Sequence, residues 1–231
     1  MAHIHLEDGA FAPLWIAVWS LVAAGMIATA LVLLRRERLS PRSIAIAAMC
    51  ASVGFAVFQV EIPTPLGPVH MNFTPLIGIL VGPGLGSLVV LVINVFSAAI
   101  GHGGWGMIGP NSIVNILEVV AAYYLFRTLR IRMARGDFWS GFTATFVALV
   151  LSAFLVVAIV TVSEIQGSEL TREQTFANLM VLAAINIGAG VVEAIVTGYV
   201  VSFVGRVRPD LLMRHRPPEG PSGSEGHITG A

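Results

Sequence analysis

The chain has 231 residues, of which 56% are hydrophobic and only 11% are charged, and its formal net charge at pH 7 is zero. Its mean hydropathy is +0.84, so the composition excludes an ordinary water-soluble domain and predicts an integral membrane protein built as one helical bundle. The single cysteine, Cys50, leaves no partner for a disulfide, and with balanced charge no nucleic-acid partner is expected.

Six apolar runs are long enough to cross a hydrocarbon core of about 30 Å as helices, and a seventh run is shorter. The six lie at roughly 12–34, 42–60, 86–101, 111–129, 139–163 and 177–204. The short run, at roughly 70–83, decides the topology, because every later loop changes side if this run does not cross.

The arginines favour a crossing. All 13 basic residues are arginines, and all except Arg172 fall in three clusters, which are Arg35, Arg36, Arg38 and Arg42, then Arg127, Arg130, Arg132 and Arg135, then Arg206, Arg208, Arg214 and Arg216. If the short run crosses, the three clusters share one side, as the positive-inside rule requires. The sequence therefore predicts an all-α membrane bundle of seven transmembrane helices, with the amino terminus outside and the carboxyl terminus in the cytoplasm. Residues 1–205 would form the transmembrane domain and residues 206–231 a disordered cytoplasmic tail.

The first residues form a metal-chelating pattern. Acidic Glu7 and Asp8 stand where a signal peptide would be basic, so the terminus is expected to be retained. A terminal amine, deprotonated amides and the imidazole of His3 can offer the square nitrogen set that suits Ni(II) or Cu(II). Met1 can be removed, because Ala2 is small.

Two loops predicted on the outer side also carry histidine. One runs from Gln59 to His70 and contains three prolines, which forbid regular helix. The other begins at Gly101 and places His102 among closely spaced glycines, which favours close backbone approach. We expect the first loop to fold into the bundle, because irregular backbone at membrane depth must be covered by protein or line a polar cavity.

Polar residues recur at helical spacing within two of the predicted spans. One stripe holds Asn111, Asn115 and Glu118, and the other holds Asn186, Gly190 and Glu193. Such stripes should face the bundle interior, where they either hydrogen-bond neighbouring helices or contact a substrate.

A small-xxx-small pattern, Ala47-x-x-x-Ala51, occurs in the second run. It permits close helix approach in lipid, either inside the bundle or against a partner.

Three motifs resemble one transporter family. The start M-A-H-I-H-L-E-D-G is similar to M-H-I-x-x-G, and V-H-M-N-F-T-P-L-I-G-I-L-V-G-P and G-H-G-G-W-G-M-I-G-P-N look like two further motifs. Together they resemble the substrate-capture S components of energy-coupling-factor transporters for nickel and cobalt, the NikM/CbiM family, from Met1 to about Gly205. The resemblance implies a core of six helices with one extra amino-terminal helix. The N-F-T-P-L form looks closer to the nickel branch.

The resemblance also implies a ligand set. In that family the metal is held by the terminal amine, the amide and imidazole of the adjacent histidine, and a second imidazole from a loop. Carried over, these become Ala2, His3 and His70. One residue, Ala2, is inserted relative to the motif, so either Met1 is removed, or Met1, Ala2 and His3 supply four nitrogens without His70. We further expect His5 and His102 as reserve ligands and support of the loop or the ligands by Asn72, Asn111, Asn115 and Glu118. Ala47 and Ala51 resemble the face by which S components dock on their coupling subunit.

The expected function is that of a transport subunit in the cell membrane rather than an enzyme. Its substrate would be Ni(II), with Co(II) as the alternative. The chain has no G-x-x-x-x-G-K-[ST] phosphate loop, so the resemblance implies a transmembrane coupling subunit and ATPase subunits as partners, and it allows a small accessory membrane subunit. The alternative is a proton-coupled secondary transporter or channel for a small solute that uses Glu118 and Glu193. No H-E-x-x-H or serine–histidine–acid grouping supports a third class, a membrane metallo-hydrolase.

Overall fold

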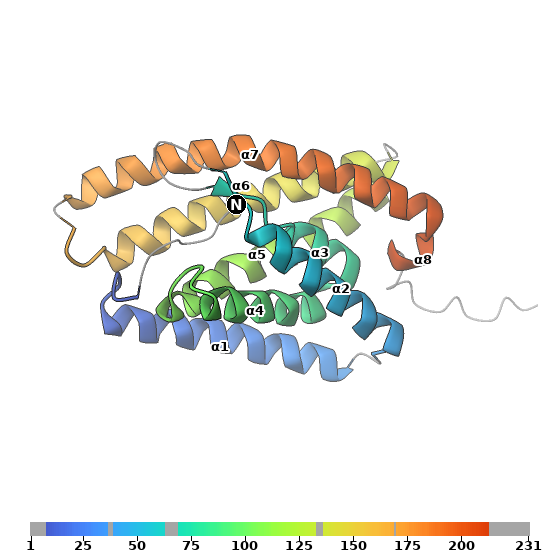
Figure 1. The fold of residues 1–231 in the computed structure, drawn as a ribbon. Helices are drawn as coiled ribbons and strands as arrows, with labels where there is room; N and C mark the ends of the chain where they lie inside the picture. The colour runs from blue at the N-terminus through green and yellow to red at the C-terminus, as the bar shows by residue number, and fades with distance from the viewer. Residues whose placement is uncertain (1–7, 37–38, 63–68, 133–135, 169, 213–231) are drawn as a thin grey trace, which may run out of the picture.

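The computed structural model describes residues 8–36, 39–62, 69–132, 136–168 and 170–212 (Figure 1). These residues form a bundle of helices with one short hairpin. The elements are α1 (Pro13–Arg36), α2 (Pro41–Phe58), β1 (Glu61–Ile62), β2 (Val69–His70), α3 (Thr74–Val81), α4 (Pro83–Ala99), the 3-10 turn η1 (Trp105–Met107), α5 (Ile108–Arg132), α6 (Gly136–Ser163), α7 (Arg172–Val207) and α8 (Pro209–Leu212). The six long predicted runs therefore correspond to six helices, with ends that differ by a few residues.

Five of the described helices are long and apolar enough to cross a membrane, namely α1, α2, α6, α7 and the continuous η1–α5 segment. A sixth, α4, is apolar and has 17 residues. Seven helices of spanning length are thus not found among the described residues, because the predicted short span at 70–83 is divided between β2 and α3.

Helix α3 is short because the backbone turns at both of its ends. Phe73 precedes it with φ 51°, and Gly82 follows it with φ 85°. Eight residues of α-helix rise about 12 Å, well under the hydrocarbon thickness. Before α3 the chain forms the antiparallel β1–β2 pair, in which Glu61 is opposite His70.

The arginine-rich segments lie at one end of the bundle. Arg42, at the start of α2, forms an ion pair with Asp210 in α8, and Arg130 near the end of α5 pairs with Asp137 at the start of α6. A Cβ added to Gly84, at the start of α4, would meet Leu34 near the end of α1. Figure 1 shows the ends of α1, α3, α5 and α7 on the same side of the molecule. Helices α2 and α4 therefore both start at the arginine-rich end, and the chain returns to that end between them, as the arginine pattern predicts.

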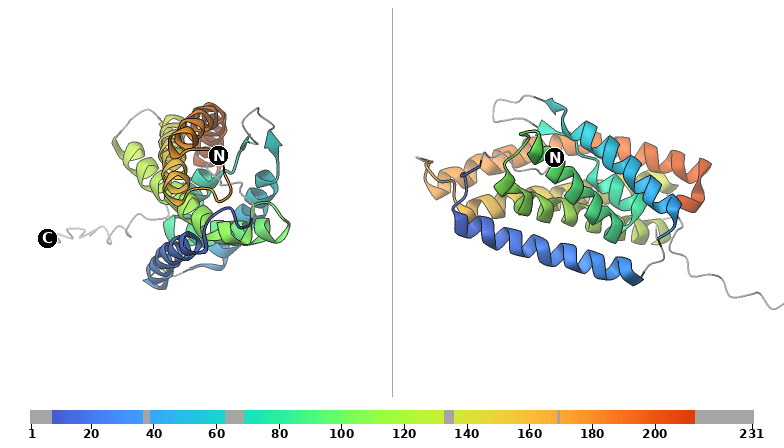
Figure 2. Two further views of the ribbon diagram at one scale, coloured as in Figure 1. Left: turned by 90° about the vertical axis from the view of Figure 1, so that its left-hand side faces the viewer. Right: turned by 60° about the horizontal axis from the view of Figure 1, so that its bottom comes forward.

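Helix α5 is the centre of the bundle, in contact with α1, α3, α4 and α6. The view along the helices in Figure 2 (left) places α1 on the periphery. Two glycines allow the closest approaches: a Cβ on Gly78 of α3 would lie 2.8 Å from Val119 Cα of α5, and one on Gly109 of α5 would lie 2.8 Å from the backbone of Ser20 in α1.

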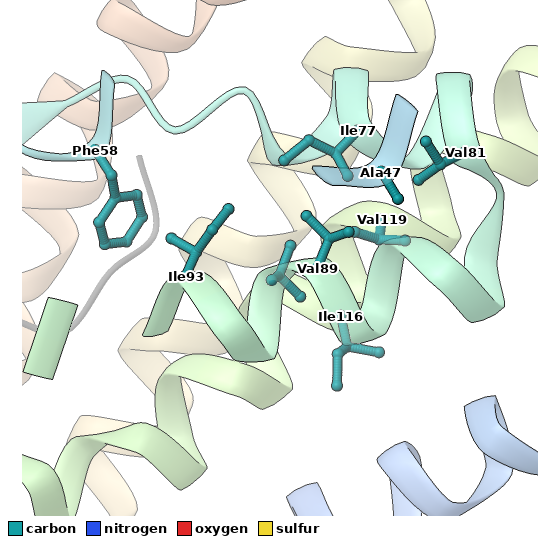
Figure 3. Close-up of a cluster of buried hydrophobic side chains, with 9 residues drawn as sticks. Ala47, Phe58, Ile77, Val81, Val89, Ile93, Ile116 and Val119 are labelled. Atoms are coloured by element: carbon teal, nitrogen blue, oxygen red, sulfur yellow. The ribbon is translucent and has the colours of Figure 1, made fainter. Parts of the chain in front are cut away.

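The proposed docking pair Ala47 and Ala51 requires a correction. Ala47 is 5% exposed and belongs to a core cluster with Ile77, Val81 and Val119, and Ala51 packs against that cluster. Figure 3 shows Ala47 among these side chains. The small side chains let α2 approach α3 closely, so Ala47 packs inside the bundle, whereas Ala51 is only partly buried.

Candidate metal centre

Two imidazoles meet around one phenylalanine where α2 and α4 end. The ring centroids of His70 and His102 are 5.6 Å apart, and Phe58 lies 4.7 Å from His70 and 5.7 Å from His102. With metal–nitrogen bonds of about 2 Å, two imidazoles on one ion have centroids roughly 4.5–6.5 Å apart. The structure therefore brings together the two loop histidines that the sequence singles out, at a separation that one metal ion could bridge.

Each histidine is held by its own element. His70 closes the β1–β2 pair and is 1% exposed. His102 follows α4, and its backbone N–H donates to the Ser97 carbonyl at 2.9 Å. Gln59, just after Phe58, donates to the Ser97 hydroxyl at 3.3 Å, so the ends of α2 and α4 are joined directly beside the imidazoles.

The segment just before α1 is anchored to the glycine loop that contains His102. The Gly106 N–H donates to Asp8 Oδ1 at 2.8 Å, and Asp8 fills the space above Gly104. The Ala10 carbonyl accepts from the Gln166 N–H at 2.8 Å, and Phe11 is fully buried. The described chain therefore begins at this Asp8–Phe11 anchor, beside the loop that carries the second histidine.

The amino-terminal ligands expected from the sequence, Met1, Ala2, His3 and His5, lie outside the described residues. Among the residues that are described, no group of three or more His, Cys, Asp or Glu side chains could hold a metal. The described part thus offers two imidazoles, and a complete ligand set requires donors from elsewhere.

Asn72, two residues after His70, joins three helices. Its side-chain amide donates to Glu118 Oε2 of α5 at 2.9 Å, and its backbone N–H donates to Glu193 Oε2 of α7 at 3.3 Å. Its own Oδ1 accepts from the Thr74 N–H at 3.1 Å, which caps the start of α3. Ser152 of α6 also contacts Glu118, at 2.6 Å. Asn72 and Glu118 therefore do lie next to the His70 strand.

The polar stripe of α5 is buried as predicted, with Asn111, Asn115 and Glu118 at most 2% exposed. Asn115 donates to Asn94 of α4 at 3.0 Å, and Asn94 donates to Ser112 at 3.2 Å. These two bonds tie α4 to α5 and are separate from the Asn72 group. The sequence analysis did not single out Asn94, Ser112 or Ser152, because a lone Asn or Ser within an apolar run carries no local signal of its partner.

Comparison with known proteins identifies the family. The sequence profile described as the cobalt uptake substrate-specific transmembrane region, CbiM, matches residues 5–211. The chain belongs to the CbiM family. It is 27% identical, over 91% of the chain and 93% of the relative, to a protein named putative cobalt transport protein CbiM 1 from Methanocorpusculum labreanum.

A second relative of the CbiM-family chain carries a nickel name. It is the putative fused nickel transport protein NikMN from Archaeoglobus fulgidus, 26% identical over 93% of the chain and 70% of the relative. A crystal structure of a protein described as a transition metal transporter matches with a TM-score of 0.76 at 18% identity, over 88% of the chain and 93% of that protein. The fold is thus that of a membrane transporter, and the chain is a multi-pass membrane component of cobalt or nickel uptake.

Proposed function

We propose that this protein is the substrate-capture subunit of an energy-coupling-factor importer for Ni(II), with Co(II) as the alternative substrate. The observation that carries the proposal is that buried His70 lies beside the His102 loop, to which the Asp8–Phe11 anchor is attached. Imidazole nitrogens suit Ni(II) and Co(II). The chelating terminus is joined to the anchor, and the anchor is bound to the loop that contains His102. ATP hydrolysis is assigned to separate partner subunits, since the chain has no phosphate loop.

The metal would be held by His70 together with nitrogens of the amino-terminal peptide. The ligand register expected from the sequence uses the Ala2 amine with the amide and imidazole of His3. Two findings favour His5 in place of His3. The family match begins at residue 5, and His5 is three residues from the Asp8 anchor, a reach of at most about 10 Å, whereas His3 is five residues away. In the His5 register the four nitrogens are the imidazoles of His70 and His5, the backbone amide of His5 and the backbone amide of the residue before it. His102 remains the reserve ligand.

The proposed topology retains seven crossings, with the anchor outside and α8 in the cytoplasm. Helix α3 would complete its crossing together with β2, which contacts α7 and whose His70 is 1% exposed beside Phe58 at the end of α2. Irregular backbone at membrane depth is acceptable in such a protein-covered position. The name of the fused NikMN relative supports a further transport subunit beside this one.

The test is Ni(II) and Co(II) binding by the purified full chain in detergent, measured by equilibrium dialysis. His70→Ala should abolish tight binding in either register. His5→Ala should do the same while His3→Ala spares binding, and the reverse pattern would restore the register with Ala2 and His3. Tight binding by all three variants would rule out the proposed capture site.

A further inference from the structure

Glu118 and Glu193 are two buried carboxyl groups of the bundle that are not among the proposed metal ligands. Both carboxyl groups are 0% exposed, and neither forms an ion pair with a basic side chain in the part of the chain that the structure describes. A buried carboxylate in a membrane protein is expensive unless it is paired and hydrogen-bonded. Two of them in one bundle therefore call for a specific role.

Both carboxyl groups converge on Asn72. Glu118 accepts from its side-chain amide at 2.9 Å, and Glu193 accepts from its backbone N–H at 3.3 Å. Asn72 Oδ1 also accepts from the Thr74 N–H. Hydrogen bonds therefore hold both the backbone and the side chain of Asn72. Asn72 lies two residues after His70, so the junction of β2 and α3 cannot shift without breaking one of these bonds.

We propose that Glu118 and Glu193 are positioning residues that hold Asn72, and through it His70, in the geometry that the metal requires. This inference rests on the proposed role of His70 as a ligand. Metal–nitrogen distances tolerate only about 0.2 Å, and groups that orient a ligand without touching the metal are needed for full affinity. Ser152 of α6 in turn fixes Glu118, so the support for His70 comes from three helices.

What Asn72 requires is an acceptor oxygen at the right place rather than a negative charge. An amide N–H needs only an acceptor oxygen at the right place, and both a carboxylate and a side-chain amide carry such an oxygen. Glutamine keeps the length of glutamate and one acceptor oxygen, whereas aspartate keeps the charge but withdraws the oxygens by one methylene, about 1.5 Å. The two substitutions therefore separate hydrogen-bond acceptance from charge.

The experiment compares Gln, Asp and Ala at positions 118 and 193 by Ni(II) dialysis and by the visible absorption of the bound Ni(II). The Gln proteins should bind close to wild type with an unchanged spectrum. The Asp and Ala proteins should bind about 10- to 100-fold more weakly with a shifted absorption band, because His70 is displaced. Thr197→Val is the matched control, since Thr197 is buried one turn after Glu193 and its hydroxyl has no hydrogen-bond partner among the described residues.

If the Asp proteins bind normally and the Gln proteins do not, charge is what counts, and the pair would be an inner cation site instead. Wild-type binding and spectrum in the Ala proteins would remove the positioning role altogether. If an Ala protein is not monodisperse, the comparison of Gln with Asp still decides. A wild-type chain that binds no metal would refute the proposed function, whereas these variant patterns test only the role of Glu118 and Glu193.

Discussion

Replacement of Gly104 by alanine is the smallest change that should dislodge the Asp8–Phe11 anchor. Gly104 has φ −82° and ψ 158°, a conformation that alanine adopts without strain. The added Cβ would lie 2.8 Å from the Asp8 backbone nitrogen and 2.9 Å from Asp8 Cγ, and closer still to Oδ1. The substitution therefore acts on the anchor by steric contact alone.

The size of the effect follows from these distances. Ordinary carbon contacts begin near 3.5 Å, so Asp8 must move by roughly 0.7 Å, and its bond to Gly106 is strained or lost. Overpacking of this kind costs about 1–3 kcal/mol, which corresponds to roughly 5- to 150-fold in affinity if metal binding needs the docked anchor. The hydrogen bond between Gly106 and Asp8 is exposed, so we expect a loss in the lower half of this range.

Equilibrium dialysis against Ni(II) measures the loss directly. Gly25→Ala and Gly188→Ala are matched controls, because a Cβ at either position meets nothing within 4 Å, and both should bind as wild type. Asp8→Asn keeps an acceptor oxygen for Gly106 and should bind better than Asp8→Ala. Wild-type affinity in the Gly104→Ala protein would refute the idea that the anchor delivers the amino-terminal ligands.

Other predictions concern packing and topology. Gly78→Ala should lower the thermal unfolding midpoint, since its Cβ would press on the Val119 backbone at a cost of about 1–3 kcal/mol; an unchanged midpoint would contradict the close approach of α3 and α5. Ala47→Leu should destabilise the bundle by a similar amount for the same reason, whereas a docking role would leave the midpoint intact and abolish only uptake. With the native cysteine replaced, Ser168→Cys should react with an impermeant thiol reagent from outside and Ile131→Cys only from inside, and the opposite labelling would reverse the proposed topology.

The sequence was sufficient for the features that depend on composition and period. Apolar length located six helices, and the arginine clusters correctly placed the ends of α1, α5 and α7 together. The i, i+4, i+7 spacing of Asn111, Asn115 and Glu118 correctly predicted one buried face of α5. These signals are local, so they can be read without knowledge of any partner.

Contacts between residues far apart in the chain could not be predicted from the sequence. Asp8 binds Gly106 across 98 positions, and Asn72 binds Glu193 across 121; no local pattern specifies either pair. The Ala47-x-x-x-Ala51 pattern left two interpretations open, because small-residue spacing is the same whether a helix packs inside the bundle or against a partner. The length of α3 also escaped prediction, because hydropathy does not show that Phe73 would adopt a positive φ.

The central claim is that His70 and the amino-terminal peptide together hold one transition-metal ion. The most direct measurement is the stoichiometry of Ni(II) bound to purified wild-type and His70→Ala protein by equilibrium dialysis, with His227→Ala as a matched histidine control. We expect one tightly bound ion per chain in the wild type and in the control, and none in His70→Ala. Undiminished tight binding by the His70→Ala protein would contradict the proposed site.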